Sequence, residues 1–128
     1  MTIKKRVLGA AAVLAVAAAT LSVTTSAQAS SYAKQYWVTT FGNAPAYAYD
    51  DHGRWRSTPG TLYAGRSFVY CKIWRNTPYS GAQGYNHYFI LTELDAPKGK
   101  EAFIPAYFLS NWGNDQAKLD DGRTIPNC

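Results

Sequence analysis

The run GTLYAGRSFVYC, from Gly60 to Cys71, carries the strongest structural signal in this sequence. It follows a proline, is interrupted at Gly65, and continues as FVYCKIW from Phe68 to Trp74. β-Branched and aromatic residues bounded by glycine and proline are typical of β-strands. The run therefore predicts a β-hairpin near the centre of the folded chain.

The alternation of the second segment predicts which of its side chains are buried. Successive side chains of a strand point to opposite faces. We therefore expect Val69, Cys71 and Ile73 to share the face toward the core, and the other face to carry Phe68, Tyr70, Lys72 and Trp74. Cys71 is then a buried thiol, and the chain's other cysteine is Cys128.

The first 29 residues have the three parts of a secretory signal peptide. Lys4, Lys5 and Arg6 form a basic start, residues 7–23 carry no charge and are mostly Ala, Val and Leu, and SAQA at 26–29 provides an A-x-A cleavage site. A membrane anchor is the alternative, but the alanine-rich run falls short of about 20 strongly apolar residues. We expect cleavage after Ala29, a secreted protein with no membrane association, and the cell wall as one location.

Removal of this leader leaves a nearly neutral chain. The sequence has 13 basic and 8 acidic residues, and three of the basic ones lie in the leader, so ten remain against eight. These charges are scattered along the chain, which argues against nucleic-acid binding. Residues 30–128 suffice for one small domain, and we expect it to be a monomer.

The two cysteines predict one disulfide. Export through an oxidising compartment favours a bond between Cys71 and Cys128. It would close a loop of nearly sixty residues, worth about 4 kcal/mol in the chain-entropy model, and would hold the C-terminal residues in place. Two free thiols in a redox or metal site are the alternative, but C-x-x-C spacing and a histidine partner are absent.

Short strand-like segments follow one another through the rest of the chain. Strands are predicted at 36–41, 44–49, 60–63, 68–74, 87–94 and 101–104, with a hairpin turn at 95–100. Two long loops are predicted at 50–60 and 75–86, a helical turn or last strand at 106–109, and a polar tail at 110–128 in which Leu119 and Ile125 make packing contacts. Closely spaced short strands favour an all-β barrel or sandwich.

The order of these segments resembles the bacterial SH3-like domains of small secreted, actinobacterial-type proteins. Three pieces carry the resemblance: APAY at 44–47, GTLYAG at 60–65 followed by Val69, and EAFIPAYFL at 101–109. The resemblance covers Val38 to Leu109. It implies a small SH3-like β-barrel of about five strands with the ligand held between two long loops, and the family's wall-targeting members bind cell-wall peptides.

Catalytic and metal-binding patterns are weak. Asp50, Asp51 and His52 are the only neighbouring residues of catalytic type, no G-x-S-x-G motif occurs, and an acidic surface turn is the preferred interpretation. His87 is interpreted as a strand-edge residue. The two histidines do not have zinc-ligand spacing, and the aspartates do not match a calcium loop. We expect no catalytic residue, no metal and no cofactor.

Aromatic residues in the two predicted loops give the better functional signal. Tyrosine and tryptophan offer a large rigid surface with a polar tip, which suits peptide or sugar binding, and Asp50 and Asp51 could meet an ammonium group. The predicted ligand-binding residues are Asp50, Asp51, Trp55, Tyr79, Tyr85 and Asn86. For Tyr47, Tyr63 and Trp74, closing the core of a small barrel is an equal alternative.

These observations predict a secreted, non-enzymatic binding module for cell-wall peptide or another extracellular ligand. The alternative is a secreted protein–protein effector, such as a protease inhibitor or antagonistic toxin, that inserts residues 77–86 into a partner protein. A small hydrolase is a third class, and it needs a catalytic pair that the sequence does not display.

Overall fold

The computed structural model describes residues 34–111 and 113–128. By its internal contacts the chain divides into two units, Met1–Lys34 and Gln35–Cys128. The predicted signal peptide, residues 1–29, lies outside the described residues. In the part of the chain that the structure describes, no helix is long and apolar enough to cross a membrane.

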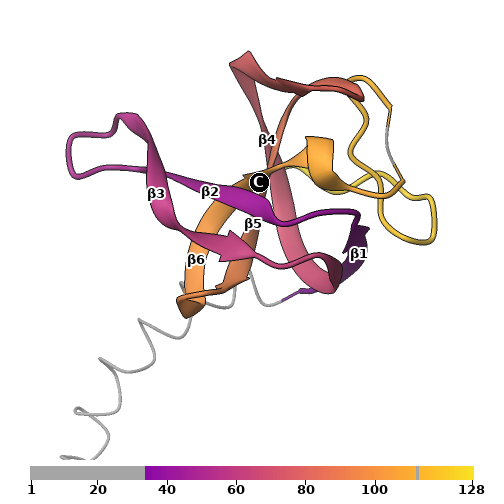
Figure 1. Ribbon diagram of the computed structural model, residues 1–128, viewed down its shortest axis with the longest axis horizontal. Helices are drawn as coiled ribbons and strands as arrows, with labels where there is room; N and C mark the ends of the chain where they lie inside the picture. Colours follow the sequence, from indigo (N-terminus) through magenta and orange to yellow (C-terminus); the bar gives the residue numbers. More distant parts are fainter. Residues whose placement is uncertain (1–33, 112) are drawn as a thin grey trace, which may run out of the picture. The chain divides into compact units, whose positions relative to one another are not determined.

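The unit Gln35–Cys128 is built from antiparallel strands, which confirms the predicted all-β class (Figure 1). They form one open sheet of six strands in the order β1-β4-β5-β6-β2-β3, where about five were expected. A 3-10 turn, η2, follows the last strand. The elements are β1 (Tyr36–Thr40), β2 (Ala44–Tyr49), β3 (Trp55–Leu62), β4 (Gly65–Gly81), β5 (Gly84–Asp95), β6 (Lys98–Pro105) and η2 (Ala106–Phe108).

The predicted loop at 75–86 is wrong. β4 continues to Gly81 and pairs with β5 up to Gly84, so only two residues form the turn. An irregularity between Trp74 and Tyr79 lets the β4 strand pass the proline at 78. The hairpin is also supported from outside, because the Tyr107 hydroxyl accepts the Gln83 N–H at 3.1 Å. Tertiary contacts thus override a composition rich in Gly, Pro and Asn.

The predicted loop at 50–60 is also too long. β3 begins at Trp55, which pairs with Tyr49, and only residues 50–54 form the turn of the β2–β3 hairpin. Asp50 closes this turn, because its Oδ1 accepts the backbone N–H groups of His52 and Arg54, each at 2.9 Å. Such a side-chain-capped turn needs few residues.

A bulge interrupts the predicted alternation of side chains in β4. Val69 pairs with Thr92 and Cys71 with Leu91, so Tyr70 is an extra residue on the β4 side. Val69 and Cys71 consequently belong to different hydrophobic clusters. The expectation that they share a face is wrong, because an inserted residue shifts every later side chain to the opposite side.

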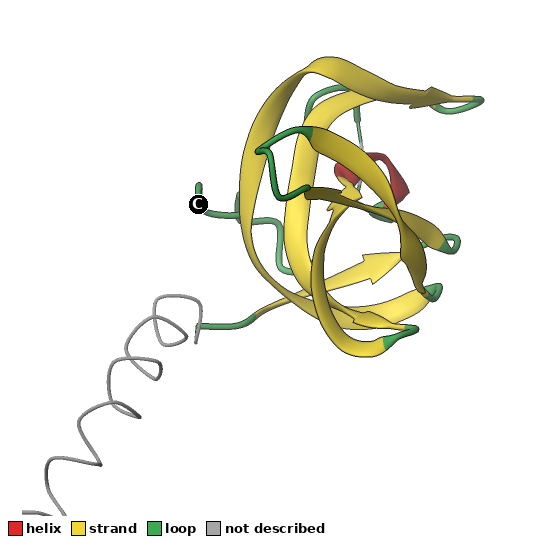
Figure 2. Ribbon diagram, turned by 90° about the vertical axis from the view of Figure 1, so that its left-hand side faces the viewer, coloured by secondary structure: helices red, strands yellow, loops and turns green. Residues whose placement is uncertain are grey.

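The two faces of the sheet carry different side chains. Figure 2 shows the long strands curving, and the main core lies on the inner face. Its members are small or aliphatic: Val38, Ala44, Ala46, Leu62, Val69, Ile90, Leu94, Ala102, Ile104, Ala106, Leu109, Ala117, Leu119 and Ile125. On the outer face a second cluster gathers Tyr70, Cys71 and Leu91 with Phe68 and Phe103.

The stretch that begins at Gly60 lies close against the end of β5. Gly60 has φ +138°, and a Cβ there would overlap the Leu94 side chain and come within 2.9 Å of the Ala96 carbonyl oxygen. Thr61 then exchanges backbone hydrogen bonds with Ala96, at 2.7 and 3.2 Å. The glycine is required both for its backbone angle and for this close approach.

The C-terminal segment returns to the sheet. Leu119 and Ile125 are both buried, which confirms their predicted packing. Beside β4, the Lys72 N–H donates to the Pro126 carbonyl at 2.8 Å, and the Cys128 N–H donates to the Lys72 carbonyl at 3.0 Å. The predicted disulfide between Cys71 and Cys128 is present, with the Cα atoms 4.8 Å apart.

Candidate functional site

Aromatic side chains meet on the outer face where the β2–β3 hairpin crosses β5. Ala46, next to Tyr47 in β2, and Ile90, next to Phe89 in β5, face the core, so alternation turns the Tyr47 and Phe89 rings outward. Trp55 stacks on Tyr47 with ring centroids 5.8 Å apart and an interplanar angle of 3°. The Phe89 ring stands edge-on to both, at 5.1 Å from Trp55 and 5.4 Å from Tyr47. These edge-to-face and stacked pairs hold the rings in fixed positions.

A cleft of about 320 Å³ opens beside these rings. One wall comes from the β2–β3 hairpin and the other from the irregular part of β4, and Phe89 of β5 completes the lining. The lining residues are Tyr47, Trp55, Arg75, Thr77, Pro78, Tyr79 and Phe89. Tyr79 is fixed from behind by the η2 segment, with its ring 5.2 Å from those of Tyr107 and Phe108.

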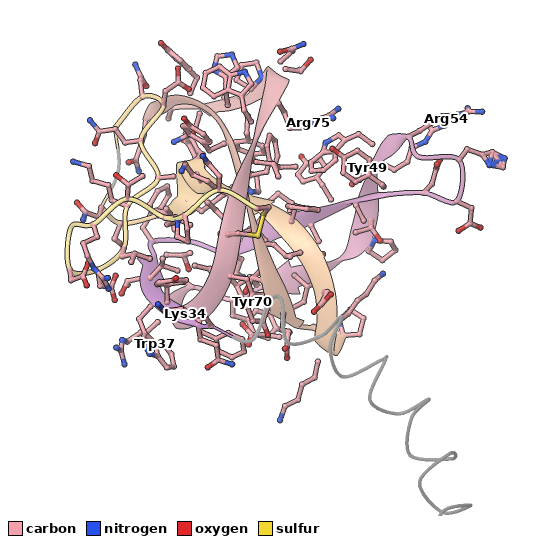
Figure 3. The ribbon with its side chains drawn as sticks, turned by 180° about the vertical axis from the view of Figure 1, so that it is seen from behind. Lys34, Trp37, Tyr49, Arg54, Tyr70 and Arg75 are labelled. Atoms are coloured by element: carbon pink, nitrogen blue, oxygen red, sulfur yellow. A yellow bond between two sulfur atoms is a disulfide. The ribbon has the colours of Figure 1, made fainter. Side chains whose placement is uncertain are left out.

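Arg75 gives the cleft a positive charge. Its guanidinium carbon lies 4.5 Å from the centroid of the Trp55 ring and 5.7 Å from that of Tyr49. Its Nη1 donates to the Tyr49 hydroxyl at 3.3 Å, and the two side chains lie next to each other in Figure 3. None of the lining residues is acidic. The cleft therefore combines aromatic walls with one cation.

The tyrosine hydroxyls add hydrogen-bonding groups to this cleft. Burial, and to a lesser extent the neighbouring Tyr79, raises the pKa of Tyr47 above its ordinary value. Like any tyrosine, Tyr47 is protonated at neutral pH, so its hydroxyl can donate a hydrogen bond as well as accept one.

The structure brings two of the predicted ligand-binding residues together and separates the others. Trp55 and Tyr79 line the same cleft, although they come from different hairpins. Asp50 and Asp51 line a separate depression of about 330 Å³ at the β2–β3 turn, with His52, Arg54 and Arg56.

The Asp50 carboxylate accepts hydrogen bonds from residues of its own turn and from the neighbouring Arg56. Besides the two backbone N–H groups, its carboxylate accepts a hydrogen bond from Arg56 Nε at 3.2 Å. The hydrogen bond from the Arg54 N–H, with smaller contributions from His52 and Arg56, holds the pKa of Asp50 below its usual value. The carboxylate thus serves the turn and lies outside the aromatic cleft.

The remaining predicted residues lie elsewhere on the β4–β5 hairpin. Asn86 is 1% exposed, its Nδ2 donates to the Gln116 carbonyl at 2.7 Å, and its Oδ1 accepts the Tyr88 N–H at 2.9 Å. Tyr85 is 41% exposed next to the hairpin turn and does not line the cleft.

The alternative that loop aromatics close the core is wrong for two residues. Tyr63 and Trp74 are 52% and 51% exposed. Tyr47 is partly buried, but it packs on the outer face against Trp55 and Phe89 rather than in the main core.

His87 has an acidic partner that sequence spacing does not suggest. Its Nδ1 lies 2.8 Å from Asp115 Oδ1, and its ring stacks on Trp74 at 4.4 Å. Among the hydrogen bonds of residues 34–111 and 113–128, none joins this ring to a hydroxyl or thiol. In the same ranges no three His, Cys, Asp or Glu side chains are grouped to hold a metal ion.

Sequence reasoning missed Arg75, Thr77, Pro78 and Phe89 as lining residues. Phe89 lies in a predicted strand where nearly every position is apolar, so its direction is not defined by pattern. Arg75 and Pro78 fall in the irregular part of β4, whose geometry depends on pairing with β5. Comparisons with protein-family models, curated proteins and solved structures found no match to this chain.

Proposed function

We propose that the protein is a secreted, non-enzymatic binding module whose aromatic cleft takes an extracellular ligand, with cell-wall peptide as the first candidate. The observation that carries the proposal is the cleft itself, in which Trp55 and Tyr79 converge from two hairpins. Binding sites of small ligands are concave and aromatic, with a few placed polar groups. The cleft has each of these properties.

The SH3-like assignment belongs to the same proposal. It is supported by the small antiparallel sheet, by its curved strands and by the 3-10 turn after β6 (Figure 2). The cleft lies between the two hairpins that occupy the places of the two long loops implied by the resemblance.

Co-sedimentation with purified insoluble cell wall tests this function. Wild-type protein, residues 30–128, is expected to pellet with the wall at both low and high salt, because aromatic contacts are only weakly screened by ions. Trp55→Ala should leave the protein in the supernatant. Trp74→Ala is the matched control, since this tryptophan is 51% exposed and lies outside the cleft.

Circular dichroism of each variant separates loss of binding from loss of folding. A folded Trp55→Ala variant that pellets as well as wild type would contradict the cleft as the wall site. Wild-type protein that stays in the supernatant would contradict the wall ligand itself.

The exposed hairpin turn supports a second candidate, the effector that docks on a partner protein. Tyr85 is 41% exposed there, and its N–H is held by Asn114 Oδ1 at 3.0 Å. A rigid hairpin with an exposed tyrosine suits insertion into a partner's site. A pull-down of secreted proteases with wild-type and Tyr85→Ala protein tests it, and equal capture by both would exclude the hairpin as the contact.

A further inference from the structure

We infer that the cleft binds the C-terminal carboxylate of a peptide, with Arg75 as its partner and a short apolar side chain against the aromatic wall. This inference rests on the proposed function, because it names the ligand chemistry of the same site. It replaces the ammonium ligand that Asp50 and Asp51 suggest from sequence, since both lie outside the cleft.

Within the described residues, Arg75 and Arg54 have no carboxylate at ion-pair distance, and of these two only Arg75 lines the cleft. Arg56, Arg66 and Arg123 each lie within 4 Å of an aspartate oxygen, at 3.2, 3.7 and 2.8 Å. The Arg75 guanidinium donates a hydrogen bond to the Tyr49 hydroxyl, at 3.3 Å. A guanidinium has five N–H donors in one plane, so most of them remain available for a ligand.

The aromatic neighbours orient this guanidinium. Trp55, with its centroid 4.5 Å away, covers one side of it, and Trp55 is itself held by Tyr47 and Phe89. A guanidinium next to a ring keeps its N–H edges for hydrogen bonding and forms two parallel bonds with a carboxylate. Lysine in its place would keep the charge but lose this fork.

The rest of the cleft limits what can accompany the carboxylate. A volume of about 320 Å³ lies at the low end for ligand sites, which suits one or two small residues. Phe89, Pro78 and the Tyr47 ring supply apolar walls, and the Tyr47 and Tyr79 hydroxyls can pair with peptide N–H and C=O groups. A peptide ending in a small apolar residue matches this combination of one cation and apolar surface.

The test compares free-acid and amide forms of the same peptides. The probes are N-acetylated tripeptides ending in Ala, Val or Leu, each with a free C-terminal carboxylate and as the carboxamide, together with glucuronic acid as a non-peptide carboxylate. Binding is followed by NMR chemical shifts of the Trp55 indole N–H and the Arg75 Nε–H in the purified protein. At least one free acid should bind about tenfold or more tightly than its amide.

Three variants distinguish the contribution of the Arg75 charge from that of its bidentate hydrogen bonding, and control for charge loss elsewhere. Arg75→Gln should abolish the preference for the acid, and Arg75→Lys should retain only part of it. Arg54→Gln removes the same charge at the β2–β3 turn, outside the cleft, and should behave as wild type. Unchanged amide shifts away from the cleft show that each variant is folded.

Equal affinity for acid and amide, an undiminished preference in Arg75→Gln, or no binding of any peptide would overturn the inference. Binding of glucuronic acid without the peptides would overturn the peptide assignment. Cell-wall pelleting distinguishes this failure from failure of the proposed function. If Trp55→Ala abolishes pelleting while Arg75→Gln leaves it intact, the binding module stands and only the carboxylate is wrong.

Discussion

The inner and outer faces of the sheet are formed by the same strands but carry different kinds of side chain. In β6, Ala102 and Ile104 point into the core, while Phe103 between them points outward. In β5, Ile90 is fully buried in the core and Phe89 contacts the cleft rings. A curved sheet leaves little volume inside, so small and aliphatic residues fill it.

In this aromatic-rich small domain, the candidate binding site lies on the outer face of the sheet. The main core cluster includes none of the cleft rings, which instead form a wall around a cation and a cleft. Aromatic surface beyond what the core requires is a frequent mark of a binding site. Three sets of substitutions measure how much each face contributes to the stability of the fold.

The largest effect is expected from removing the disulfide, which links the outer cluster to the C-terminal segment. Replacing Cys71 and Cys128 together by Ser should lower the free energy of unfolding by about 4 kcal/mol, because a long loop is no longer closed in the unfolded chain. Urea unfolding of the variant measures this loss, and reduced wild-type protein serves as the matched comparison. An unchanged unfolding midpoint would show that this link contributes little.

Neighbouring residues in β6 offer a direct comparison of the faces. Ile104→Ala should cost about 3 kcal/mol, since Ile104 is completely buried in the core. Phe103→Ala should cost about 1 kcal/mol, mainly the loss of its ring contacts with Trp55 and Tyr49. Thermal or urea unfolding of both variants provides the test. Equal losses would mean that the outer face stabilises the fold as much as the core does.

A third, smaller effect concerns Tyr70, a buried residue of the outer cluster. Burial, followed by its hydrogen bond to Glu93 and the charges of Glu93 and Glu101, raises the pKa of Tyr70 to about 12. The unfolded chain releases this proton near pH 10, so the stabilisation is present below pH 10 and is lost as pH rises toward 12.

Tyr70→Phe isolates this contribution from the other tyrosines. Wild-type stability should fall more steeply than that of the variant between pH 10 and pH 12, when both are followed by urea unfolding. Parallel curves would place the Tyr70 hydroxyl in an environment no different from water.

The sequence was sufficient for the all-β class and for the disulfide. β1, β2 and β6, the turn after β5, and the buried Leu119 and Ile125 all follow from local composition and spacing. The disulfide follows from cysteine number and the expected oxidising compartment, without any geometry.

The sequence was not sufficient for the bulges and the long hairpin. Tyr70 is inserted opposite a regular β5, and no local pattern marks such an extra residue. The 75–86 segment has loop composition, but Tyr107, more than twenty residues away, supports it as a hairpin. The same limit applies to the cleft. Trp55 could be predicted from its residue type, whereas the position of Arg75 in the cleft depends on the irregular path of β4.

The Tyr107 side chain under the β4–β5 hairpin has a consequence for the speed of recognition. Its ring contacts that of Tyr79, and its hydroxyl accepts a hydrogen bond from the Gln83 N–H in the hairpin turn. A Cβ added at Gly81 would collide with the same hydroxyl. A wall held in this way is already in its bound shape, so little ordering entropy is lost when a ligand arrives. Ligands of the cleft should therefore associate at similar rates and differ chiefly in residence time.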